Sequence, residues 1–124
     1  MVIAKLLIAI GATIDAKNNN AFTPSLILAD INATTNDGRT ALHLASKKGH
    51  LDVCKYFVSK GCDVNAIDER TFTSLHDASF DGHFEVTEDL IAKGAKIDAK
   101  DIDGFTPLSN AAQEGHLKLV KFLH

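Results

Sequence analysis

The side chains of this sequence that can do chemistry are six histidines and two cysteines, because imidazoles and thiols act as acid–base groups, nucleophiles and metal ligands. Asp77 directly follows His76, which sets a carboxylate beside an imidazole and suggests general acid–base catalysis. Cys54 and Cys62 are eight positions apart, form no CxxC pair and have no base placed beside them by a motif. We therefore expect two reduced thiols rather than a zinc site, a disulfide or a nucleophile.

The spacing of the histidines distinguishes a catalytic or metal-binding role from a structural one. His43 and His76 are 33 residues apart, and His50, His83 and His116 follow each other at the same step. A catalytic or metal site brings different residue types together once, whereas a structural role recurs in every repeat. We therefore expect structural histidines, no catalytic residue, no metal site and no cofactor, and the single glycines provide no phosphate-binding loop.

The same step of 33 residues governs most of the chain. It relates three threonines, three leucines, three alanines and three Gly-His pairs. These positions are Thr40, Thr73 and Thr106; Leu42, Leu75 and Leu108; Ala45, Ala78 and Ala111; and Gly49-His50, Gly82-His83 and Gly115-His116. A period of this length indicates stacked repeats that share one continuous core.

Each repeat predicts two short helices. The threonines can cap the first helix through their hydroxyls, and Pro107 suits a first helical position. These first helices should end near Lys48, Asp81 and Glu114, and each Gly-His pair then turns the chain into a second helix with an apolar face. Gly61 and Gly94 should end the second helices in the left-handed conformation, before a polar, hairpin-like finger leads to the next repeat.

The segment DGRTALHLASKKGHLDVCKYFVSKGCDVNAID, residues 37–68, resembles an ankyrin repeat. Its TALHLA motif, which begins at Thr40, is repeated as TSLHDA from Thr73 and partly as TPL from Thr106, where Ser109 replaces the histidine. The resemblance implies an all-α ankyrin repeat solenoid of stacked helix-turn-helix units joined by β-hairpin-like fingers. It also implies that the histidines hydrogen-bond backbone and threonine groups within each turn.

The resemblance extends over residues 1–124 as a single array, with full repeats at 37–69 and 70–102 and partial repeats at 1–17 and 103–124. The repeat at 18–36 is sixteen residues shorter than the period, between Pro24 and Asp30. Five residues cannot hold a helix, a turn and a helix. We expect missing residues and a chain break there; the alternative is an engineered, spliced or natural deletion.

Thr71 stands where Gly38 and Gly104 stand, at a turn position that favours positive φ. A β-branched residue resists this conformation, so this finger should be strained or reshaped, and Thr71→Gly should stabilise the fold. In the same repeat Asp77 replaces Leu44, and Asp89 replaces an aromatic residue. We expect this repeat to hide less apolar surface than its neighbours and to be the weakest of the array.

The resemblance implies a binding surface on the finger tips and the exposed side of the first helices, which together form a concave face. Residues at these positions do not pack and can therefore recognise a partner. Position by position, the candidates are Asn36, Asp37, Arg39, Lys47 and Lys48; Glu69, Arg70, Phe72, Phe80 and Asp81; and Ile102, Asp103, Phe105, Gln113 and Glu114.

Three of these candidates are phenylalanines, although polar side chains would suit a solvated surface equally well. Phe72 and Phe105 are one period apart on adjacent fingers, and Phe80 lies on the first helix behind Phe72. They can form one apolar patch with a charged edge, as interfaces with aromatic anchors do. The alternative is that Phe72 and Phe105 only pack along their own fingers.

Composition narrows the class of partner. The chain is 45% hydrophobic with a formal net charge of −3 and no basic stripe, which argues against nucleic acid. Its longest apolar run is far shorter than the roughly 20 residues of a membrane-spanning helix. We expect an intracellular protein, cytoplasmic or nuclear, that binds another protein and is monomeric unless exposed terminal repeats associate. The alternatives are a regulatory or targeting segment of a larger multidomain protein and, less favoured by the periodicity, an enzyme.

Overall fold

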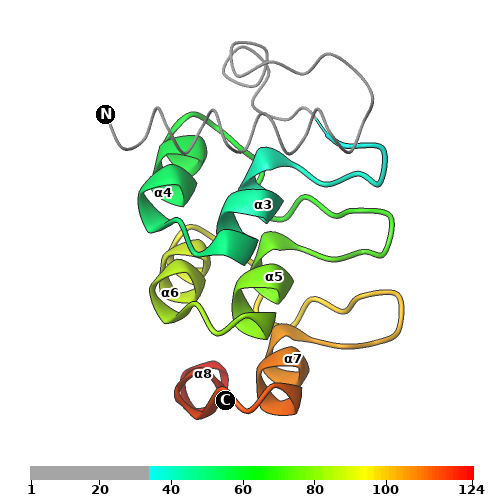
Figure 1. Cartoon of the computed structure of the whole chain (residues 1–124), viewed down its shortest axis with the longest axis vertical. Coiled ribbons are helices and arrows are strands. Elements are labelled where there is room, and N and C mark those ends of the chain that lie inside the picture. Colours follow the sequence, from blue (N-terminus) through cyan, green and yellow to red (C-terminus); the bar gives the residue numbers. More distant parts are fainter. Residues whose placement is uncertain (1–33) are drawn as a thin grey trace.

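The computed structural model describes residues 34–124, which form three stacked pairs of helices (Figure 1). The first pair is α3 (Ala41–Lys48) with α4 (Leu51–Ser59). The second pair is α5 (Ser74–Phe80) with α6 (Phe84–Ala92), and the third is α7 (Pro107–Gln113) with α8 (Leu117–Leu123). The first helices α3, α5 and α7 form one layer, the second helices form another, and the fingers project from the side of the first layer (Figure 1). The described part is thus the all-α solenoid that the period predicts.

Each first helix begins with a capping box. The threonine hydroxyl accepts a hydrogen bond from the backbone N–H three residues later, and the side chain at that position accepts one from the threonine N–H. The pairs are Thr40 with His43, Thr73 with His76, and Thr106 with Ser109. The second helices are followed by Gly61 at φ 93° and Gly94 at φ 100°, so the predicted caps and stops are confirmed.

One face of each helix builds the core between the two layers. Leu42 and Leu75 from the first helices are fully buried, as are Val53, Phe57 and Leu90 from the second helices. Burying such a side chain contributes about 1.5–3 kcal/mol, so the core stabilises the stack mainly through these repeated positions.

The fingers are hairpin-like turns held by backbone groups. In the finger that leads into the 70–102 repeat, Asp68 N–H donates to the Phe72 carbonyl at 3.1 Å. The Asp68 carboxylate accepts from the N–H groups of Arg70 and Phe72, both at 2.9 Å. Asp101 forms the same bonds one period later, and Glu69 N–H joins its finger to the Asp37 carbonyl of the preceding one at 3.0 Å. Backbone bonds, together with the carboxylates of Asp68 and Asp101, therefore set the position of each tip.

Thr71 has φ 62°, beside 81° for Gly38 and 84° for Gly104. The predicted strain is therefore present at this residue. The expected reshaping is not, because the Thr71 N–H donates to the Asp68 carbonyl at 3.0 Å just as Gly104 donates to Asp101. The predicted break between Pro24 and Asp30 lies outside the described residues.

The histidines tie consecutive repeats together. His43 accepts the Thr40 N–H on Nδ1 and donates Nε2–H to the carbonyl of Phe72 at 2.9 Å, and His76 does the same with Phe105. Burial lowers the pKa of both imidazoles, which keeps them neutral. The predicted bonds to threonine and backbone are confirmed, with one correction: the carbonyl acceptor belongs to the next finger rather than to the same turn.

Candidate functional site

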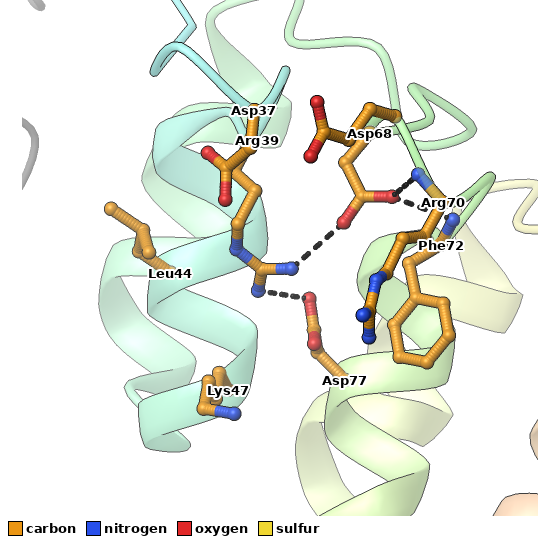
Figure 2. Close-up of a pocket in the computed structure, with 9 residues that line it drawn as sticks. Asp37, Arg39, Leu44, Lys47, Asp68, Arg70, Phe72 and Asp77 are labelled. Carbon is orange, nitrogen blue, oxygen red and sulfur yellow. Dashed lines mark hydrogen bonds and ion pairs between the residues drawn. The ribbon is translucent and has the colours of Figure 1, made fainter. Parts of the chain in front are cut away.

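A hollow of about 430 Å³ lies between α3 and α5, beneath two adjacent fingers (Figure 2). It collects side chains from both repeats and from both fingers. They are Asp37, Arg39, Leu44, Lys47, Asp68, Glu69, Arg70, Phe72 and Asp77. Six of these nine residues are among the predicted surface candidates; Leu44, Asp68 and Asp77 are not.

Arg39 forms the floor of the hollow together with the carboxylates of Asp68, from the next finger, and Asp77, from the next repeat (Figure 2). Its Nη1 is 2.9 Å from Asp68 Oδ2, and its Nη2 is 2.7 Å from Asp77 Oδ2. The exposed fraction of the side chain is 11% for Arg39 and 5% for each aspartate. Arg39, a candidate for partner contact, is thus engaged in a nearly buried ion pair that bridges two repeats.

For Asp77, the role expected from the sequence was incomplete. We expected it only to reduce the buried apolar surface, but it is 4% exposed and holds Arg39. Burial raises the pKa of this carboxyl to about 6, an effect that the positive charge of Arg39 only partly offsets. The missed signal was a paired change: Arg39 stands where Phe72 stands one period later, and Asp77 stands where Leu44 stands one period earlier.

Charged side chains surround the mouth of the hollow. Lys47, Glu69 and Arg70 are exposed, and Asp37 is partly exposed and accepts a hydrogen bond from the Thr35 hydroxyl. Figure 2 shows the Arg70 side chain running beside the Phe72 ring. Lys47 also favours the ionised form of Asp77 through its positive charge.

The three phenylalanines differ in their exposure. The Phe72 ring stacks on the imidazole of its own repeat, His76, with ring centroids 5.1 Å apart and planes inclined by 19°. Phe80 is 37% exposed and Phe105 is 43% exposed. Phe72 therefore packs on the first helix of its own repeat, while Phe80 and Phe105 present apolar surface to solvent. That the three rings form one patch stays a prediction.

The other candidate residues are exposed at finger tips or at the ends of first helices. Ile102 is the most exposed of the large apolar ones, at 68%. The remaining exposed candidates are Asn36, Lys48, Asp81, Asp103, Gln113 and Glu114.

The two cysteines and the possible metal ligands are the potentially reactive side chains of the described residues. Cys54 and Cys62 are buried, and burial raises the pKa of each thiol to about 11, so both are protonated near neutral pH. Within residues 34–124, no group of three or more histidine, cysteine, aspartate or glutamate side chains could hold a metal ion. Of the helices in the described part, none has the length and apolar character needed to span a bilayer.

Comparison with known families agrees with this architecture. Residues 3–101 match the family model described as ankyrin repeats (3 copies), and residues 103–124 match the model described as ankyrin repeat. Ankyrin repeats generally act as protein–protein interaction modules, and such domains are typically non-catalytic. On these matches and on the stacked helix pairs, the chain belongs to the ankyrin repeat family.

Proposed function

We propose that this chain is a non-catalytic protein–protein interaction scaffold that binds a partner protein through the concave face of finger tips and first helices. The observation that carries the proposal is that backbone bonds position the fingers. Glu69 N–H joins its finger to Asp37, and Ile102 N–H joins the next finger to Arg70 at 3.0 Å. The tip side chains are therefore available for recognition on a preorganised surface, which reduces the entropic cost of binding.

Exposed aromatic side chains support this choice of face. Phe80 and Phe105 are exposed, and so are the charged candidates Asp81, Arg70 and Glu114. Aromatic anchors with a charged rim are typical of protein interfaces, where a few such residues contribute most of the binding energy.

A selected peptide can test the proposal. The chain would be used to select binders from a displayed library of random 16-residue peptides, and the affinity of a selected peptide would be measured by fluorescence anisotropy. We expect Phe105→Ala to weaken binding at least about tenfold, which corresponds to about 1.4 kcal/mol. The thermal midpoint should change little, because this ring is 43% exposed.

The matched control is Leu117→Ala, which removes an exposed apolar side chain from α8 in the opposite layer. Its peptide affinity should equal that of the parent chain. Selected peptides that lose affinity with Leu117→Ala but keep it with Phe105→Ala would place binding on the outer layer and contradict the proposal. Phe72→Ala is a poorer probe, because its ring also stacks on His76.

A further inference from the structure

The floor of the hollow carries one negative charge more than its own residues neutralise. The single positive charge of Arg39 lies between the carboxylates of Asp68 and Asp77, at 2.9 Å and 2.7 Å. Asp68 is also fixed by backbone donors, since its Oδ1 accepts the N–H groups of Arg70 and Phe72. An excess charge on side chains this deeply buried is unfavourable unless a cation or a proton compensates it.

Asp77 is the member of this cluster that can accept a further partner. Its Oδ2 accepts from Arg39 Nη2, whereas its Oδ1 accepts no hydrogen bond from residues 34–124. Burial raises the pKa of this carboxyl to about 6, because the positive charge of Arg39 compensates its negative charge only in part. The charged groups that act on it are Arg39 and Lys47 from the α3 repeat and Asp68 from the finger above.

The charges around the mouth do not remove the excess. Asp37 and Glu69 contribute two negative charges there, and Lys47 and Arg70 contribute two positive ones. The lining as a whole therefore keeps the net charge of −1 that is set at the floor. A partner carboxylate entering the hollow would approach Asp77, whereas a partner cation would neutralise it.

The walls suit a long basic side chain. Leu44 lies on the α3 side and Phe72 on the opposite side of the hollow (Figure 2). The methylene stem of an arginine can cover such an apolar wall while its planar head reaches a carboxylate or stacks on an aromatic ring. A volume of about 430 Å³ accommodates one such side chain.

We propose that this hollow receives one basic side chain of the partner protein, an arginine, whose guanidinium donates to Oδ1 of Asp77 while its stem lies against Leu44 and Phe72. This inference rests on the proposed function and specifies the chemistry of the partner at one point of the concave face. It predicts that binding replaces a proton on Asp77 under mildly acidic conditions.

The test uses a small probe, so that no partner protein is needed. The chain would be labelled with ¹⁵N and titrated with N-acetyl-arginine methylamide at pH 7. The corresponding citrulline compound serves as a neutral isostere, and the glutamate compound carries the opposite charge. We expect saturable shifts of the Asp77 and Phe72 amides and of the Arg39 Nε–H with the arginine probe alone, at a dissociation constant on the order of millimolar.

Two substitutions and a pH series test whether the charge of Asp77 determines the affinity for the probe. Asp77→Asn keeps the shape of the side chain and an acceptor for Arg39 but removes the charge, so the affinity for the probe should fall at least about tenfold. Glu88→Gln, which removes one exposed charge from α6, is the matched control and should leave the affinity unchanged. Between pH 7 and pH 5 the parent affinity should decrease as a proton occupies Asp77, whereas that of Asp77→Asn should stay constant.

Several results would overturn the inference. These are equal binding of the citrulline probe, preferential binding of the glutamate probe, an absence of saturable shifts at the hollow, and equal effects of Asp77→Asn and Glu88→Gln. If Asp77→Asn fails to fold, the comparison of probes and the pH dependence on the parent chain decide alone. The peptide experiment with Phe105→Ala is independent of this titration, so failure of the arginine pocket and failure of the binding face are distinguishable.

Discussion

Replacing Thr71 by glycine should stabilise the protein, although it removes a side chain. Thr71 has φ 62°, and its side chain makes no hydrogen bond to the described residues. The left-handed conformation costs an L-residue about 1–2 kcal/mol. Glycine relieves this cost but gives the unfolded chain more freedom, which offsets about 0.4–1 kcal/mol. The expected net gain in the free energy of unfolding is about 0.5–1 kcal/mol, or about 2–4 °C in thermal midpoint.

Urea unfolding followed by circular dichroism at 222 nm measures this gain as a higher midpoint with an unchanged m-value. Gly104→Ala is the reverse variant: Gly104 has φ 84°, and a Cβ there would meet no atom within 4 Å. Its loss of about 0.5–1 kcal/mol would therefore come from backbone conformation alone. A midpoint for Thr71→Gly that is unchanged or lower, at the same m-value, would refute the reasoning.

Three further predictions concern the buried polar groups. Arg39→Met should lower the free energy of unfolding by about 3–5 kcal/mol because it leaves buried carboxylates unpaired, and Arg39→Met with Asp77→Leu should be distinctly more stable than Arg39→Met; equal urea midpoints would contradict this. Burial lowers the pKa of His43 and His76 in the folded state, so the unfolded state binds more protons and stability should fall as the pH drops below about 6.5. Asp77 acts in the opposite direction, because the folded state takes up its proton first, near pH 6, and this gain grows as the pH falls towards 3.8. Asp77→Asn should therefore steepen the acid loss of stability, and a pH profile parallel to that of the parent would argue against the assignment. Both cysteine thiols should react with an aromatic disulfide reagent at pH 8 only as fast as the protein opens, so a rapid reaction of either thiol in the folded state would count against their burial.

The helices, their caps and their stops were predictable because they depend on local spacing. A threonine three residues before a histidine specifies a capping box within one turn, and glycine after the second helix specifies its end. The period then places each helix beside its counterpart, because each unit packs on its neighbour. Thr71 was recognisable as strained for the same reason, since its register in the finger is fixed by Gly38 and Gly104.

The ion pair beneath the hollow was not predicted, because it joins residues 38 positions apart across two repeats. From the sequence, Asp77 was compared with Leu44, the apolar residue at the same repeat position. Arg39 was treated as an exposed surface residue. Each judgement is reasonable for a single repeat. Only the stacking of the two repeats in space shows that the two positions face each other, with Arg39 Nη2 2.7 Å from Asp77 Oδ2.

The bond from His43 to the Phe72 carbonyl also bears on protein engineering. Each finger leads into one repeat, but its position relative to the helices is fixed by a donor in the repeat before it. A transplanted repeat would therefore bring its own recognition residues and yet take their position from its new neighbour. In this chain, a graft of residues 70–102 into another array should keep its binding geometry only if the recipient supplies a histidine at the position of His43.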